Sequence, residues 1–319
     1  MDVVYFVIQL AIASTVPLAI VAFGALFSER SGVVNIALEG IMLMGGFVGA
    51  VVISALEHQL PIQIVAFIGL LVGATVGIIY SLLHAYASIN MKSNQIISAT
   101  ALNMFAPAFA IFMARTFTAA GTQKITLDKA YKIKEVPFLA DIPVIGDIFF
   151  KQAFVSTYIG IAIFVVATLV LYRTKFGLRL RSCGENPHAA DSLGINIYKI
   201  RYAGVMISGA LAGMGGVIFV LSFANDFNAT VSGFGFLALA VLIFGQWHPG
   251  KILIAAVFFG LMRVISSAYA AIGFLDKLQL PSEIYSMIPY IATLIVLAFV
   301  SKKSAAPLAA GTPYDPGKR

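Results

Sequence analysis

The chain has 319 residues, of which 60% are hydrophobic and only 11% are charged, and its net charge is +7. A soluble domain carries about 25% charged residues, so this composition excludes an ordinary soluble protein. The basic excess predicts residues that lie at membrane ends and fix orientation, not a nucleic-acid-binding surface.

Long apolar runs predict an all-α fold, a polytopic transmembrane helical bundle of about eight to ten spans. Barrel-type segments of alternating hydrophobicity are not found in the sequence. The run at 234–247 is short for a full crossing, which predicts a half-helix or re-entrant element. The candidate spans are 3–27, 33–56, 61–89, 93–114, 153–172, 203–224, 234–247, 251–272 and 284–301. The first run follows no basic residue, so it is not expected to be a cleaved signal peptide.

Polar residues inside the early apolar runs are candidates for a transport pathway. Asn35 and Glu39 in "SGVVNIALEGIMLMGG" are four residues apart and share a helix face. An ionisable group within a membrane helix is costly and is a functional candidate. The alternatives are that both residues cap a broken helix, or that they pair with Arg30. Asn103 in "ATALNMFAPAF" is a further pathway candidate, or its amide bonds a neighbouring helix.

Basic residues predict the orientation of the spans. The 173–202 connection carries six Lys and Arg residues against Glu185 and Asp191, which predicts a cytoplasmic location. The N-terminus and the 115–152 loop are then extracytoplasmic, and the C-terminus is cytoplasmic. Residues 1–301 form the predicted transmembrane domain. The tail at 302–319 is rich in Pro, Gly and Ala, which predicts disorder.

A polar stretch between two apolar spans, "RSCGENPHAADSLGINIYKIR" at 181–201, has the pattern of a short docking helix. Asn186 is a suitable N-cap, and Gly194 is a suitable stop. The alternative is a solvated loop, since a conspicuous loop only hints at function. The candidate docking residues are Gly184, Glu185, Asn186, Pro187, Ala189, Ala190, Asp191 and Gly194.

Small residues recur at four-residue spacing in the span that follows. "SGALAGMGG" contains Gly209, Gly213 and Gly216, and Gly73 and Gly77 repeat the pattern. Such spacing lets helices approach closely in lipid. These glycines predict tight helix packing and indicate nothing about the solute.

Motifs for catalysis and metal binding are not found in the sequence. "GQWHPGKI" approaches a phosphate-binding loop, but Ile252 stands where a hydroxyl is needed for magnesium. The histidines are scattered and Cys183 is the single cysteine. We therefore expect no enzyme activity, no metal site and no cofactor bound by this chain. Arg263 in "FFGLMRVISSAY" is another pathway candidate, or the partner of a carboxylate.

Taken together, the motifs resemble the permeases of ABC importers in the branched-chain amino acid, ribose and nucleoside superfamily. The 181–201 stretch is similar to their cytoplasmic coupling loop, and "SGALAGMGG" is similar to the helix that follows it. Three further stretches, "SERSGVVNIALEGIMLMGG", "GFGFLALAVLIFGQWHPGK" and "IPVIGDIFF", resemble the nucleoside branch.

The resemblance implies a type II-like ABC importer permease in a bacterial plasma (inner) membrane. It implies four partners: a separate ABC ATPase subunit that holds ATP and magnesium, a second paralogous permease, an extracytoplasmic substrate-binding lipoprotein and a nucleoside. Phe234 departs from the pattern, which often has Arg at this position. The alternatives are the same importer class with a sugar or other small polar solute, and a stand-alone secondary transporter driven by an ion gradient.

Overall fold

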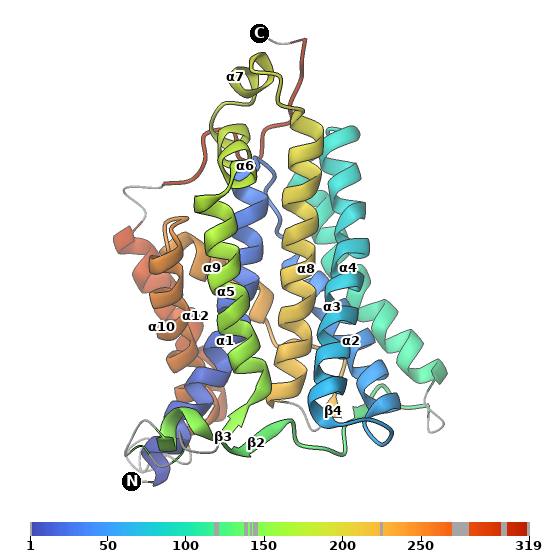
Figure 1. Ribbon diagram of the computed structural model, residues 1–319, viewed down its shortest axis with the longest axis vertical. Helices are drawn as coiled ribbons and strands as arrows, with labels where there is room; N and C mark the ends of the chain where they lie inside the picture. Colours follow the sequence, from blue (N-terminus) through green and yellow to red (C-terminus); the bar gives the residue numbers. More distant parts are fainter. Residues whose placement is uncertain are drawn as a thin grey trace.

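Transmembrane helices dominate the computed structural model, which describes residues 2–117, 121–136, 140, 142, 146–223, 226–269, 281–300 and 305–317. The predicted end of the 251–272 span and residues 301–304 lie outside this described part. The helices run roughly along the long axis of the molecule, with the two termini at opposite ends (Figure 1).

The long apolar runs form helices because a backbone in lipid must satisfy its own hydrogen bonds, and a helix does so within one segment. The helices are α1 (Asp2–Arg30), α2 (Leu38–Leu56), α3 (Ile62–Ala85), α4 (Gln95–Phe117), α5 (Val155–Arg173), α6 (Lys175–Glu185), α7 (Pro187–Ser192), α8 (Ile197–Phe223), α9 (Phe234–Phe244), α10 (Pro249–Ser267) and α12 (Ser282–Val300). Two short π-helices, η1 (Tyr86–Asn90) and η2 (Gly146–Phe150), complete the helical elements of the described residues.

Seven helices of the described part are long and apolar enough to cross a membrane, and α12 adds another apolar helix of 19 residues. The predicted polytopic helical bundle is therefore confirmed. Helix α9 has 11 residues, which span about 16 Å at 1.5 Å per residue. This length is about half of a hydrocarbon core, so α9 is the half-helix that the short 234–247 run predicts.

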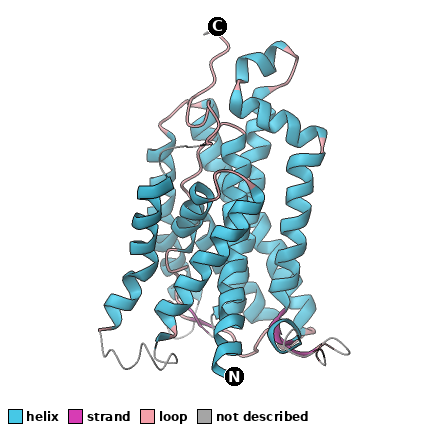
Figure 2. Ribbon diagram, turned by 90° about the vertical axis from the view of Figure 1, so that its left-hand side faces the viewer, coloured by secondary structure: helices cyan, strands magenta, loops and turns pink. Residues whose placement is uncertain are grey.

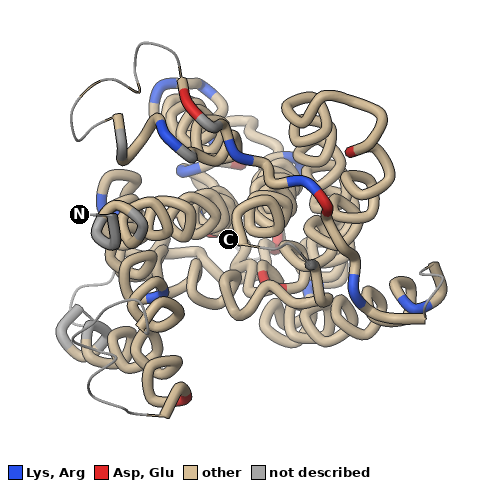
Figure 3. The backbone as a smooth tube through the Cα atoms, turned by 90° about the horizontal axis from the view of Figure 1, so that it is seen from below, with Lys and Arg blue, Asp and Glu red and all other residues tan. Residues whose placement is uncertain are grey.

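Two short antiparallel sheets lie at the end of the bundle that holds the N-terminus, whereas loops gather at the opposite end around α7 (Figure 2). Strand β1 (Ile125–Thr126) pairs with β4 (Asp226–Phe227), and β2 (Lys132–Glu135) pairs with β3 (Lys151–Phe154). We call these two ends the sheet end and the α7 end. Seen along the helices, charged residues are sparse on the backbone trace (Figure 3).

The chain between α1 and α2 is not helical, although the sequence predicted one span over 33–56. Helix α1 ends at Arg30 and α2 begins only at Leu38. The predicted start was wrong because residues 31–37 are mostly apolar but take an extended path inside the bundle. Their backbone groups are bonded by side chains from other helices, as described below.

Helix α8 is the centre of the bundle and packs against α1, α2 and α3. Glycines allow the backbones to touch: an added Cβ on Gly213 would overlap Gly73 O, and one on Gly209 would overlap Gly77 O. A Cβ on Gly45 of α2 would lie 2.5 Å from Gly213 Cα. Residues Gly209, Gly213 and Gly216 thus face α2 and α3 at backbone contact distance, the close approach that small residues permit in lipid.

The C-terminal segment, residues 305–317, packs against the α7 end. Its Ala309 N–H donates to Gly184 O (2.8 Å), and its Gly311 N–H donates to Gly32 O (3.1 Å). The Tyr314 side chain is only 6% exposed. The sequence predicted disorder over 302–319, and for these described residues the structure differs, because backbone hydrogen bonds and one aromatic anchor hold a segment of low average hydropathy.

Candidate functional site

The extended segment between α1 and α2 brings polar groups into the bundle. Asn35 is fully buried, its Oδ1 accepts from Ala37 N–H (3.1 Å), and its Nδ2 donates to Ser208 Oγ (3.0 Å). His84 Nε2 lies 3.0 Å from Val34 O. Because unpaired backbone groups are costly in an apolar interior, these side chains are what permit a break in the helix at this depth.

Asn103 supports the same break from α4. Its Oδ1 accepts from Gly40 N–H (2.8 Å), and its Nδ2 donates to Ile36 O (2.9 Å). The amide therefore uses both of its ends on the backbone at the start of α2. Asn103 thus bonds a neighbouring helix, which was the alternative to a role in the pathway. Its side chain does not line the cavity described below.

Glu39 joins the first turn of α2 to the first turn of α9. Its Oε1 accepts from Gly233 N–H (2.9 Å), and its Oε2 accepts from Gly235 N–H (2.7 Å) and Phe236 N–H (3.3 Å). These donors are the orphan groups of a helix N-terminus, where a negative charge is favourable. Glu39 therefore caps α9, whereas the alternatives open from the sequence were a cap of its own broken helix and a pair with Arg30.

The glycines of "GFGF" allow this junction to form. Gly233 has a φ of +78°, which glycine adopts readily and other residues avoid. A Cβ on Gly235 would lie 2.5 Å from Glu39 Cα, so only glycine lets the two helix ends approach. Ser232, at φ 54°, is also left-handed. Such strain in a non-glycine residue often lies at functional sites.

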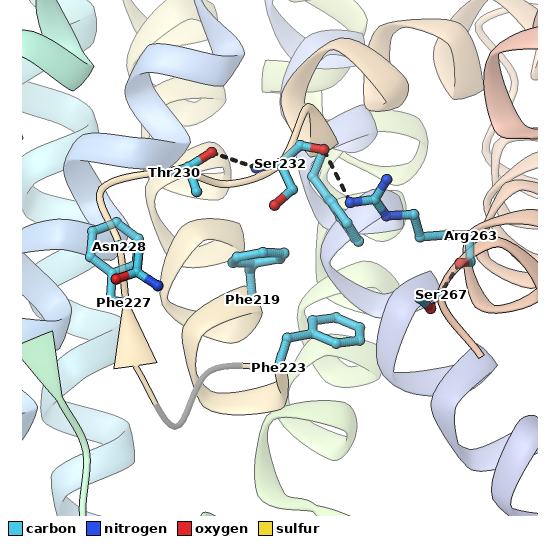
Figure 4. A pocket seen from close by; sticks show the side chains of 9 residues that line it. Phe219, Phe223, Phe227, Asn228, Thr230, Ser232, Arg263 and Ser267 are labelled. Carbon is cyan, nitrogen blue, oxygen red and sulfur yellow. Dashed lines mark hydrogen bonds between the residues drawn. The ribbon is translucent and has the colours of Figure 1, made fainter. Parts of the chain in front are cut away.

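Beneath this junction lies a cavity of about 270 Å³, which we call the phenylalanine-lined cavity. Phe219 and Phe223 come from α8, Phe227 and Asn228 follow from β4, and Arg263 and Ser267 come from α10 (Figure 4). Its complete lining is Phe219, Phe223, Phe227, Asn228, Thr230, Ser232, Phe234, Arg263 and Ser267. Flat aromatic faces and a few polar groups are typical of small-molecule sites.

Arg263 contributes the positive charge of the cavity. Its Nη2 donates to Ser232 O (3.3 Å), and its Cζ lies 5.4 Å from the centre of the Phe234 ring. Phe234 in turn packs edge-on against Phe219 at 4.9 Å. At the position where the family pattern often has Arg, this chain therefore has a phenylalanine with the Arg263 guanidinium over its face, an arrangement favoured by cation–π attraction.

A short helix, α7, lies where the sequence predicted a docking helix, and its docking role stays a prediction. Asn186 is its N-cap: the Oδ1 atom accepts from Ala189 N–H (3.0 Å), and Pro187 occupies the first turn. Gly194 ends the turn at φ +79° with no atom within 4 Å of an added Cβ. A larger residue at this position would therefore be disfavoured by backbone conformation, not by a clash.

A polar network connects the end of α6, directly before α7, to the bundle. Glu185 Oε1 lies 3.0 Å from Arg30 Nη1, and Arg30 Nη2 donates to Trp247 O (3.1 Å). The buried Trp247 indole donates to the buried Glu29 carboxylate (2.5 Å). Gly184 packs so closely on Arg30 O that a Cβ would overlap it. A displacement of the α6–α7 junction would therefore reach α1 and the turn between α9 and α10.

At the sheet end, Glu57 anchors the loop between α4 and α5. It accepts from the N–H groups of Asp128 (3.1 Å) and Lys129 (3.3 Å) and from the Tyr131 hydroxyl (3.3 Å). Burial raises the pKa of Tyr131, and the Glu57 charge raises it further, so the phenol stays protonated and donates. His58 joins Glu57 and Asp128 within 4.8 Å, a cluster that sequence spacing did not reveal.

Sequence reasoning identified some members of the site and missed others. Glu39 and Arg263 both contact the segment that begins α9. Asn35 and Asn103 instead support the helix break before α2. Phe219 and Phe223 were missed because they occur in the apolar run of α8, and the Glu29–Trp247 bond was missed because its partners are far apart in sequence. The one available signal was the "GFGF" glycine pattern.

These features describe a multi-pass membrane protein with a phenylalanine-lined cavity and, at its α7 end, a short helix outside the membrane spans. The family model described as branched-chain amino acid transport system / permease component matches residues 7–297, and the chain belongs to this family. It is the membrane-spanning component of a transport system. This confirms the resemblance seen in the motifs.

Individual relatives are similar over nearly the whole chain. The nucleoside ABC transporter permease protein NupC of Lactococcus lactis is 40% identical over 303 residues, covering 95% of this chain and 94% of the relative. The guanosine ABC transporter permease protein NupQ of Bacillus subtilis is 41% identical over the full length of both chains. The putative glucose ABC transporter permease protein TsgC13 of Haloferax volcanii is 29% identical, covering 90% and 88%.

Proposed function

We propose that this chain is the permease subunit of an ATP-driven ABC importer for nucleosides. The observation that carries the proposal is the identity of 40–41% over nearly the whole chain to two permeases named for nucleosides and guanosine. The relative named for glucose is only 29% identical. Nucleosides are thus favoured over a sugar as the solute.

The phenylalanine-lined cavity suits the chemistry of a nucleoside. Rings such as Phe219 and Phe223 offer faces on which a base stacks, and one stacked base contributes about 1–3 kcal/mol. Asn228, Thr230 and Ser232 are exposed and offer hydrogen bonds to ribose hydroxyls or base edges. We assign this cavity to the translocation pathway. Glu39 holds the start of α9 and thereby positions the cavity wall that Ser232 and Phe234 form.

The α7 end faces the cytoplasm in this proposal, and the membrane is a bacterial plasma (inner) membrane. The support is the 173–202 connection, which carries six Lys and Arg against two acidic residues. The N-terminus and the sheet end are then extracytoplasmic. The C-terminus is cytoplasmic, consistent with termini at opposite ends of the bundle (Figure 1).

Three protein partners complete the importer. A separate ATPase subunit binds ATP and magnesium and contacts the α7 helix, a paralogous permease forms the other half of the pathway, and an extracytoplasmic lipoprotein delivers the nucleoside. No cofactor is bound by this chain. ATP shifts the permease between inward- and outward-facing states only if the ATPase binds ATP differently in the two states.

Purification followed by reconstitution tests the proposal. We expect the tagged chain to recover the ATPase and a second permease from native membranes, as identified by mass spectrometry. With its binding lipoprotein, the reconstituted complex takes up labelled guanosine with ATP, and ion gradients are not required. Uptake of glucose instead would assign the sugar alternative. Recovery of this chain alone, with uptake driven by an ion gradient, would establish a secondary transporter and refute the proposal.

The cavity assignment has its own variant. Phe223→Ala removes one stacking face, and we expect about 5- to 150-fold weaker substrate interaction from the 1–3 kcal/mol of one stacked base. Phe112→Ala on α4, 66% exposed and outside the cavity, is the matched control. Equal uptake kinetics in both variants would exclude Phe223 from the pathway.

A further inference from the structure

The C-terminal segment, residues 305–317, is bonded to the α7 end at several points. Arg201 of α8 is 1% exposed and donates from Nη1 to Thr312 O (3.0 Å). Asp315 lies 3.3 Å from Lys92 Nζ, at the turn before α4. The segment is therefore fixed to several parts of the bundle at once.

The same segment also packs beneath the docking helix. Tyr314 forms a buried cluster with Cys183 of α6, Ala190 of α7 and Ile197 of α8. Its ring centre lies 5.3 Å from that of His188. Leu308 N–H donates to Glu185 Oε2 (3.4 Å), on the carboxylate that also pairs with Arg30. The segment and α7 thus form one packed unit.

Between them lies a second cavity of about 270 Å³, which we call the α7–tail groove. Its lining residues are Glu185, Asn186, Pro187 and His188 on one side, and Leu308, Ala309, Thr312, Pro313 and Tyr314 on the other. The groove exists only because the C-terminal segment supplies its second wall.

Two leucines of this unit are exposed to an unusual degree. Leu308 is 87% exposed and Leu193 is 81% exposed, the two highest values among the exposed large hydrophobic residues of the described part. Neither residue belongs to a membrane-spanning helix, so lipid does not account for their exposure. Leu308 also lines the groove, so the groove and this leucine together form the candidate contact surface.

We propose that the C-terminal segment and α7 form one composite docking surface for the ATPase subunit, with Leu308 as a contact residue and Tyr314 as the anchor that holds the two together. This inference rests on the proposed function. The ATPase subunit is the occupant because Pro187 and His188 of α7, the helix proposed to contact the ATPase, also line the groove, at the end proposed to face the cytoplasm.

The contact is tested with the purified complex by comparing Leu308→Asp with Ala305→Asp. Ala305 is exposed in the same segment but does not line the groove, so it controls for added charge. We expect Leu308→Asp to weaken ATPase binding about tenfold or more, since burying a leucine side chain is worth at least one factor of ten. Ala305→Asp should bind as the wild type does.

The chain's single cysteine reports whether the segment stays packed. Cys183 is fully buried under Tyr314, so we expect slow maleimide labelling in the wild type and in Leu308→Asp. Tyr314→Ala should uncover the thiol and raise the labelling rate about a hundredfold at pH 8 as the thiolate becomes accessible. An unchanged rate in Tyr314→Ala would overturn the anchor role.

The outcomes separate this inference from the proposed function. Wild-type affinity for the ATPase in Leu308→Asp, or equal losses in both aspartate variants, would overturn the composite surface while leaving the importer intact. A wild-type chain that recovers no ATPase would instead overturn the proposed function itself. Loss confined to Leu308→Asp, with Cys183 still protected, is the result that the composite surface predicts.

Discussion

Replacement of Glu39 by glutamine removes the charge at the α9 junction while keeping the shape of the side chain. Both carboxylate oxygens accept backbone hydrogen bonds, one from Gly233 and the other from Gly235 and Phe236. A glutamine has only one acceptor oxygen. In its best orientation it keeps the Gly235 and Phe236 bonds and turns its NH₂ group toward the Gly233 N–H.

The size of the effect follows from this geometry. Loss of one hydrogen bond to a charged acceptor costs about 1.5–3 kcal/mol, and loss of the charge at a helix N-terminus costs about 0.3–1 kcal/mol more. The sum of about 2–4 kcal/mol shifts the balance between the ordered and the frayed start of α9 by at least about 30-fold. Because Phe234 and the loop before it form the cavity wall, nucleoside uptake should fall about tenfold or more.

Initial rates of nucleoside uptake, normalised to the amount of permease in the membrane, measure the effect of Glu39→Gln. The matched control is Glu57→Gln, because Glu57 is a buried carboxylate that also accepts backbone N–H groups, but at the sheet end. We expect normal assembly with the ATPase in both variants, and a large transport defect only in Glu39→Gln. Wild-type uptake by that variant, at normal abundance, would refute the role of the α9 cap.

Three other substitutions or measurements test separate parts of the structure. Gly213→Leu should abolish accumulation of the permease in membranes, as measured by immunoblot, because a Cβ already overlaps Gly73 O; Gly250→Ala, whose nearest neighbour is 4.0 Å away, should accumulate normally. Glu185→Lys should leave ATPase activity in the complex but reduce coupled uptake about fivefold or more, because a lysine repels Arg30; unchanged coupling would exclude this ion pair from transmission. Burial raises the pKa of Cys183 to about 11, so maleimide labelling should rise about tenfold per pH unit from pH 7 to 10; a plateau near pH 9 would contradict this.

The spans were predictable because their signal is local. Twenty apolar residues must form a helix in lipid whatever their neighbours are, so the bundle followed from hydropathy alone. The break before α2 was not predictable in the same way. Residues 31–37 remain apolar enough to continue a span, and the groups that stabilise the break, such as Asn103 and His84, come from other helices.

The cavity was beyond sequence reasoning for a related reason. A helix that is hydrophobic on every side has no amphipathic face to mark the side that lines a cavity. Phe219 and Phe223 in α8 therefore resemble any other apolar residues of their span. Glu39 and Arg263 stood out only because charges are rare in such runs, and the sequence left open whether Glu39 faced solute or backbone.

The C-terminal segment illustrates the limit of composition. Pro, Gly and Ala lower its average hydropathy, which predicted disorder. One aromatic residue and a few backbone hydrogen bonds were sufficient to pack it, and neither contributes much to an average. Its partners, Gly184 and Arg201, are more than 100 residues away along the chain.

The glycine contacts of α8 constrain how this permease can move. Where side chains separate two helices, rotamer changes can accommodate a displacement of one helix along the other. Where glycines bring the two backbones into contact, no side chain is present to accommodate such a displacement. We therefore expect helices α2, α3 and α8 to move together, with α1 held against α8 where an added Cβ on Gly24 would lie 2.9 Å from Ser208 O. The hinges of the transport cycle then belong to the peripheral helices and to the short α9, whose two ends are already held in left-handed backbone at Ser232 and Trp247.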